Sequence, residues 1–287
     1  MELTFTSDHS RTDGFIMILR IVGKGGRITV IFSKDYWEKE WDALEKQERR
    51  YLRKQKEENP SVIRQKISQK IPEQLESTLN EAFVKAFALV FEKGTGIIEK
   101  SYQKNRYEQE YQDNEAIAAK ENNRKSVKAF ARQAGRSRAK NLLISGAEGA
   151  GLGVLGIGIP DIPIFTAVLL KSIYEIALSY GFSYDSEEEQ CFILGIIETS
   201  MLRGERLIYS NNWINTEIDS GLPALEEKQK LIRQAAESLS AELLHLKFLQ
   251  GIPLVGVAGG LADSLYLKKI TEYADLKYRR RFLKGKI

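Results

Sequence analysis

The feature that most constrains this chain is a long segment with almost no charge and many glycines. Residues 141–160 contain one ionisable side chain, Glu148, and glycines at positions 146, 149, 151, 153, 156 and 158. Each glycine inside a water-exposed helix costs about 1 kcal/mol relative to alanine, so a compensating cause is needed. Close approach of two helices is such a cause, because small residues at four-residue spacing let backbones nearly touch.

The same small-residue spacing recurs near the C-terminus. Gly149 and Gly153 lie four residues apart, and so do Gly256 and Gly260 within a second apolar segment, residues 248–262. We expect such glycines to serve helix packing, or contact with a membrane or a partner protein. The full set is Gly146, Gly149, Gly153, Gly156, Gly158, Gly256 and Gly260.

Two interpretations of the apolar segments compete. A turn at residues 161–163 joins the first segment to a second apolar helix, expected over residues 164–180. Both approach the length of about 20 residues that crosses a bilayer. However, Glu148 and Lys171 would be expensive in lipid unless paired, and glycines weaken a spanning helix. We therefore favour glycine-rich helical hairpins buried in a protein core, with Glu148 and Lys171 paired across the first hairpin.

The remainder of the chain predicts a mostly α-helical protein. Residues at three- and four-residue steps from Trp37 to Leu52 form an apolar helical stripe, in which Glu48 is the charged member. The proline in residues 59–60 is expected to end this helix. A second helix is expected to begin at residues 71–73, because proline is tolerated in a first turn.

Two segments differ from this helical pattern. Residues 15–22 and 27–32 are strand-like and flank a glycine-rich turn, which predicts a β-hairpin. Residues 101–124 are polar, and either an exposed helical extension or a flexible insertion fits them. We therefore expect an N-terminal β-hairpin extension over residues 1–34 and a multi-helix domain over residues 35–287.

The net charge of +4 conceals a strong partition along the chain. Residues 1–140 carry +7, residues 141–267 carry −9 and residues 268–287 carry +6. Solvated helix faces are the simplest explanation of the basic segments. Contact with anionic lipid comes next, because each basic residue near such a surface contributes about 1 kcal/mol. Nucleic acid ranks third, because stacking aromatics are sparse. The expected basic surface comprises Arg132, Arg136, Arg138, Lys140, Arg279, Arg280 and Arg281.

Composition leaves little room for metal or nucleophilic chemistry. One cysteine, Cys191, excludes a disulfide framework and a zinc site built on cysteines, and His9 and His245 are the only histidines. The sequence contains no zinc-protease, nucleophile-elbow or phosphate-loop motif. We predict no cofactor and no metal, and we interpret Cys191 as a buried, inert thiol.

An enzymatic interpretation would use carboxylates beside the apolar segments. Glu148 and Asp161 are the first candidates, since burial can turn a carboxylate into a general base. Asp161 lies between two prolines, where a turn or helix N-cap residue is the simpler interpretation. Glu198 is expected to pair with a cation of the Arg203 type. The acidic residues 187–189 predict a solvated helix N-terminus.

Several motifs occur together in a pattern typical of one bacterial family. The central ones are Gly146-x-x-Gly149, Gly156-x-Gly158-Ile-Pro-Asp161-Ile-Pro163, Ile173-Tyr-Glu-Ile-Ala177 and Tyr180-Gly181-Phe182. The flanking ones are Trp41-x-x-Leu44-Glu45, Ile71-Pro72 with Leu75, Ile252-Pro-Leu-Val-Gly256 with Gly259-Gly260, and Tyr278 with Arg281-Phe282-Leu283. From about Tyr36 to the C-terminus the chain resembles the EcsC family. Residues 1–33 and 101–124 depart from that pattern.

The resemblance implies a mostly helical protein associated with an ABC-transporter operon linked to secretion and competence. It brings no established catalytic residues. We therefore expect a non-enzymatic accessory protein at the cytoplasmic membrane face, peripheral to the inner membrane, with anionic lipids and an ABC transporter as partners. The alternative is a lipid- or small-molecule-processing enzyme, or a lipid-binding module, that uses the acidic residues near the first glycine-rich segment.

Overall fold

The structure of the chain is a computed structural model. It describes residues 3–7, 16–23, 26–33, 36–57, 66–92, 104–121, 127, 162–221, 227–249 and 259–287. The first glycine-rich segment, with Glu148 and Asp161, lies outside the described residues, and so do the basic residues of the segment 132–140. The pairing of Glu148 with Lys171 therefore stays a prediction.

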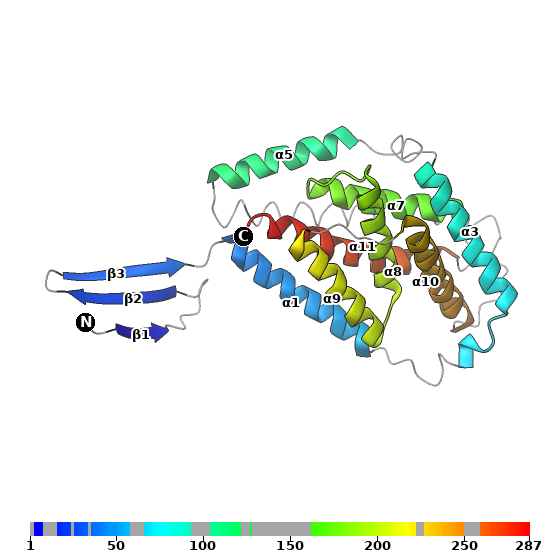
Figure 1. The fold of residues 1–287 in the computed structure, drawn as a ribbon, viewed down its shortest axis with the longest axis horizontal. Helices are drawn as coiled ribbons and strands as arrows, with labels where there is room; N and C mark the ends of the chain where they lie inside the picture. Colours follow the sequence, from blue (N-terminus) through cyan, green and yellow to red (C-terminus); the bar gives the residue numbers. More distant parts are fainter. Residues whose placement is uncertain are drawn as a thin grey trace.

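The described part of the chain is mostly helical, as predicted (Figure 1). Three strands, β1 (Leu3–Ser7), β2 (Ile16–Gly23) and β3 (Gly26–Ser33), form an antiparallel sheet in that order. Figure 1 shows this sheet to one side of the helices. The helices are α1 (Tyr36–Glu57), α3 (Glu73–Glu92), α5 (Lys104–Glu121), α7 (Ile162–Ser179), α8 (Glu187–Met201), α9 (Gly204–Ser220), α10 (Lys228–Leu249) and α11 (Gly259–Lys284).

Local sequence signals set several of these boundaries. Helix α3 begins directly after Pro72, as predicted, because proline lacks the N–H that a first helical turn leaves unpaired. Helix α8 begins at Glu187, and the Ser186 hydroxyl caps it by accepting a hydrogen bond of 3.2 Å from the Glu189 N–H. Gly181, just beyond α7, has a φ of +81°, a left-handed conformation that glycine adopts without strain.

Helix α7 lies in the core of the helical domain. It packs against α3, α5 and α11, and Leu169, Leu170 and Ile173 on it are fully buried. Among the described residues, α7 is the one helix that is long and apolar enough to cross a membrane, yet 67% of it is buried inside the protein. Burial in the core therefore accounts for the apolar character of α7.

Helices α7 and α11 run side by side in the same direction (Figure 1). Tyr180, which follows α7, donates a hydrogen bond of 2.9 Å to Asp275 in the C-terminal half of α11. Its ring also lies 6.0 Å from that of Phe282. The C-terminal ends of the two helices thus meet, so their first residues, Ile162 and Gly259, lie toward the same end of the domain.

Helix α5 resolves the two alternatives for the polar segment 101–124, since residues 104–121 are helical. One face of α5 docks on the core through Tyr107 and Tyr111. Two ion pairs also hold the helix, one at its first residue, at 3.0 Å between Lys104 and Asp185, and one in its C-terminal half, at 2.5 Å between Lys286 and Glu115. The remaining face is polar and mostly exposed, which explains the weak apolar pattern of this segment.

Candidate functional site

A buried ionic cluster joins α1, α9 and α11. The Lys277 side chain is fully buried and donates hydrogen bonds to Glu48, to Asn211 at 2.6 Å and to Asn215 at 2.7 Å. Asn215 donates in turn to Glu48 at 2.9 Å, and Tyr273 donates to Asn211 at 3.0 Å. All three protons of the ammonium group therefore have acceptors, as a buried charge requires.

Arg280 extends this cluster toward the surface. Its guanidinium donates to Asp219 at 3.1 and 2.5 Å and approaches the second oxygen of Glu48 at 3.4 Å. The same group lies 4.7 Å from the centre of the Trp41 ring, in cation–π geometry. Glu48 thus faces two cations from α11.

The electrostatics of the cluster follow from its burial. Burial lowers the pKa of Lys277 to about 8, although the neighbouring Glu48 carboxylate opposes this shift. Burial alone would raise the pKa of Glu48, but Lys277, Asn215 and Arg280 together bring it below its usual value. The cluster therefore holds Glu48 ionised, in contact with the Lys277 ammonium group, whose pKa burial lowers.

A second internal ion pair connects α8 with α11. Glu189 accepts hydrogen bonds of 2.6 Å from both Tyr278 and Arg281, and its side chain is buried. The Arg281 guanidinium also lies 4.3 Å from the centre of the Phe182 ring. The prediction that residues 187–189 are simply a solvated helix start is therefore wrong for Glu189, which faces inward toward α11.

The predicted basic surface at residues 279–281 is wrong in the same way. Arg280 is buried, Arg281 is partly buried against Glu189, and Arg279 is partly buried and pairs with Glu40 at 2.6 Å. The physical reason is that α11 packs between α1, α8 and α9, each of which supplies a carboxylate. A positive stretch of sequence becomes part of the interior when its partners lie on other helices.

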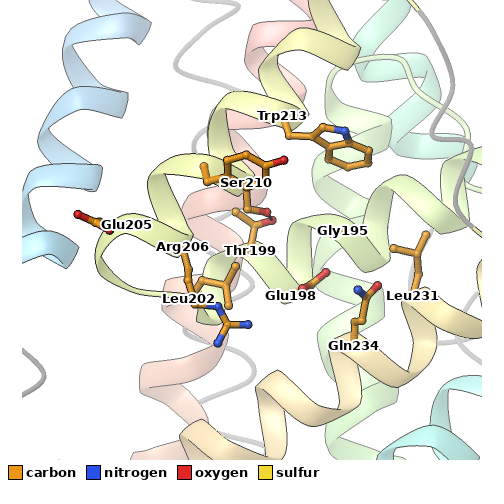
Figure 2. A pocket seen from close by; sticks show the side chains of 11 residues that line it. Gly195, Glu198, Thr199, Leu202, Glu205, Arg206, Ser210, Trp213, Leu231 and Gln234 are labelled. Carbon is orange, nitrogen blue, oxygen red and sulfur yellow. Dashed lines mark hydrogen bonds between the residues drawn. The ribbon is translucent and has the colours of Figure 1, made fainter.

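A cavity of about 450 Å³ lies between α8, α9 and α10. Figure 2 shows the Glu198 and Gln234 side chains converging on the same space from α8 and α10, with Trp213 of α9 on another side. The Thr199 and Ser210 hydroxyls are hydrogen-bonded to each other at 2.6 Å on its wall. The lining thus combines two carboxylates, an arginine, neutral polar groups and two aromatic residues, so it offers a small ligand both polar and aromatic contacts.

The structure describes only some of the candidate residues that the sequence suggested. Glu148, Asp161 and the glycines from 146 to 158 lie outside the described residues, as does Gly256, whereas Gly260 lies in the first turn of α11. Cys191 is free and buried as predicted, and burial raises the pKa of its thiol. Arg203 pairs with Glu242 at 3.0 Å. Among the described residues, no group of three His, Cys, Asp or Glu side chains is arranged to hold a metal ion.

Sequence reasoning missed the ionic cluster and the cavity. One signal for the cluster was available, because Glu48 interrupts the apolar stripe of α1, whose other members face the core. The partners of Glu48 gave no comparable signal, since Lys277 belongs to a strongly basic segment and lies 229 residues away in sequence.

The comparison with known proteins identifies the family. A profile of the EcsC protein family matches residues 38–283. The chain belongs to the EcsC protein family. It is 26% identical over 227 residues to Protein EcsC of Bacillus subtilis (strain 168). The aligned region covers 77% of this chain and 85% of that protein. No solved structure matches this EcsC-family chain. The matched region begins two residues into α1 and ends in the last turns of α11, and it leaves out the strands.

Proposed function

We propose that this EcsC-family protein is a peripheral accessory protein of the cytoplasmic membrane face that assists transport or secretion by binding, without chemistry of its own. The observation that carries this proposal is the parallel course of α7 and α11. Residues 141–160 lead into α7, and residues 248–262 span the connection from α10 to α11. Because Ile162 and Gly259 lie toward the same end of the domain, both glycine-rich apolar segments connect to the helices there.

Exposed apolar side chains near the same helix starts support the proposal. Ile164, in the first turn of α7, is 39% exposed, and Leu265, early in α11, is 54% exposed. The basic residues at positions 132, 136, 138 and 140 precede the first glycine-rich segment in sequence. Exposed apolar side chains and positive charge each favour an anionic bilayer surface, where burial of the former and attraction of the latter add together.

Vesicle binding tests the membrane part of the proposal. We expect the purified full-length chain to sediment with vesicles containing phosphatidylglycerol and much less with vesicles of phosphatidylcholine alone. Binding should weaken as salt is raised, because salt screens exposed charges over a Debye length of about 10 Å at 0.1 M. Failure to bind anionic vesicles at low salt would refute the membrane role.

The transporter part requires a separate test. Family membership suggests an ABC transporter as the partner, so we expect the chain to co-purify with transporter subunits from detergent-solubilised membranes of its own cells. The control is a chain in which the exposed α1 residues Arg49 and Arg50 are both changed to Gln. It should co-purify with the same subunits, because the proposed contact end is unchanged. Purification of the chain from solubilised membranes without any transporter subunit would refute this part of the proposal alone.

A further inference from the structure

We propose that the cavity between α8, α9 and α10 binds a small amphipathic primary amine in its ammonium form. The inference is independent of the membrane role, because the residues that carry it lie on the facing sides of these three helices. It rests on a glycine without a packing reason, on two converging oxygen-bearing side chains and on the aromatic rings beside them.

Gly195 indicates that the cavity is kept open. This residue lies in the middle of α8, where glycine is the least favourable residue apart from proline. Glycines in helices usually allow a close neighbour, yet a Cβ added at Gly195 would meet no other atom within 4 Å. Gly195 is nevertheless buried and lines the cavity, so its missing side chain leaves space rather than contact.

The polar groups around that space favour a hydrogen-bond donor with a positive charge. The Gln234 Oε1 atom is buried and has no hydrogen-bond partner within the described part of the chain. Glu198 supplies a carboxylate from the facing helix (Figure 2). An ammonium group carries three N–H donors and can donate to this amide oxygen and to the carboxylate together, since a carboxylate accepts several hydrogen bonds, whereas a quaternary ammonium group has no proton to donate.

The remaining lining selects the body of the ligand. Trp213 and Tyr209 of α9 line the cavity and are 37% and 78% exposed, so their rings are accessible to an apolar group or to the cation itself. Leu202 and Leu231 add apolar walls. Arg206 lies farther along the cavity beside Leu202 (Figure 2), where its charge would repel a second ammonium group. Glu205 also lines the cavity, but Figure 2 shows its side chain directed away from Glu198 and Gln234. A monoamine with an apolar body therefore fits this lining better than a polyamine.

Calorimetry on the full-length chain tests the chemistry of the ligand, with 2-phenylethylamine as the probe. We expect saturable binding of this amine, and no binding of 3-phenylpropionate or 1,4-diaminobutane at the same concentration. Glu198→Gln should weaken binding by about tenfold, as expected for the loss of one charge-assisted hydrogen bond. Equal binding of 3-phenylpropionate, an unchanged affinity in Glu198→Gln, or no saturable binding of the amine would overturn the proposal.

The same ammonium chemistry occurs on a free amine and on a lipid headgroup. A short-chain phosphatidylethanolamine, titrated in the same way, distinguishes these sources. Tighter binding of the lipid that Glu198→Gln weakens would support the site with a headgroup as its ligand. Tighter binding of 2-phenylethylamine would support a free amine instead.

Substitutions at Gly195 separate loss of the site from loss of the fold. Gly195→Ala should fold and raise the melting temperature by about 2 °C, because alanine favours the helix and meets no obstacle. Gly195→Leu should fill the cavity, keep the helical circular dichroism spectrum and abolish binding of 2-phenylethylamine. Full binding by a folded Gly195→Leu variant would overturn the proposal, as would a marked loss of stability in Gly195→Ala.

Discussion

Individual buried charges connect helices that lie far apart in the sequence of this protein. Glu48 is 6% exposed and accepts hydrogen bonds from Lys277, Asn215 and Arg280, which lie on two other helices. Charge buried in this way contributes to stability only while every partner is present, because an unpaired buried charge is strongly unfavourable. Exposed pairs on the same helix do not share this property, since water replaces a lost partner.

The first prediction compares these two situations on α1. Glu48→Gln should lower the free energy of unfolding by about 3 kcal/mol, because two buried cations lose their common counter-ion. Glu45→Gln is the matched control, since Glu45 pairs with the exposed Arg49 at 3.4 Å and its loss should change the free energy by less than about 0.5 kcal/mol. Urea unfolding followed by circular dichroism measures both, and similar losses would contradict the prediction.

The second prediction concerns pH. The pKa of Lys277 is about 8 in the folded chain, against 10.5 for the exposed amine of the unfolded chain. Between these values the unfolded state binds more protons, so the contribution of Lys277 to stability rises with pH and is lowest below pH 8. We expect the free energy of unfolding of the natural chain to increase relative to Lys277→Met between pH 8 and 10. A free energy of unfolding of the natural chain that falls relative to that of Lys277→Met over this range would contradict the assigned shift.

At the scale of elements, α11 organises the domain because it contacts α1, α7, α8 and α9. Its arginines and Lys277 face carboxylates on three of these helices. Tyr180 and Asp275 join it to the end of α7 at 2.9 Å. Helix α11 therefore combines an apolar side with ionic contacts, which explains why its hydrophobic periodicity is weak although most of it is buried.

Sequence alone predicted the elements better than their contacts. Proline at 72 and the acidic residues after Ser186 predicted the starts of α3 and α8, because capping depends on neighbours in sequence. The inward direction of Glu189 and Arg280 could not be predicted, since each is buried by a helix far away in the chain. The cavity likewise depends on the separation of three helices, which no local pattern encodes.

Helix α5 provides the third prediction, which tests how it docks. Gly181 has a φ of +81°, and a Cβ there would lie 2.4 Å from the Tyr111 ring of α5. Gly181→Ala should lower the free energy of unfolding by about 2–3 kcal/mol, from backbone strain of about 1–2 kcal/mol and displacement of this ring. Gly221→Ala is the control, because its φ is +67° but nothing lies within 4 Å of the added atom.

Thermal unfolding of the two variants separates these effects. The difference between them reports the contact with Tyr111, since both carry the backbone strain. Tyr111→Ala should cost less stability in the Gly181→Ala chain than in the natural chain, because the two changes share one contact and are not additive. Equal destabilisation by Gly181→Ala and Gly221→Ala would show that the Tyr111 ring of α5 does not pack against Gly181.

At the scale of the whole molecule, the distribution of charge differs from what the sequence suggests. The C-terminal segment of residues 268–287 carries a net charge of +6, yet Lys277, Arg279, Arg280 and Arg281 pair inside the helical domain. These cations are therefore committed to acidic side chains. The basic residues at 132, 136, 138 and 140 remain the cluster proposed to meet anionic lipid.

The fourth prediction follows from this division. Changing Arg132, Arg136, Arg138 and Lys140 to Gln should weaken binding to phosphatidylglycerol vesicles by about 4 kcal/mol at low salt, since each basic residue contributes about 1 kcal/mol. Changing the exposed Arg49, Arg50, Arg53 and Lys54 of α1 to Gln removes the same charge and is the control. If net charge alone drives binding, both quadruple variants weaken it equally, and the proposed contact end is wrong. A loss confined to the first variant locates the lipid contact at the segment that leads into the glycine-rich stretch.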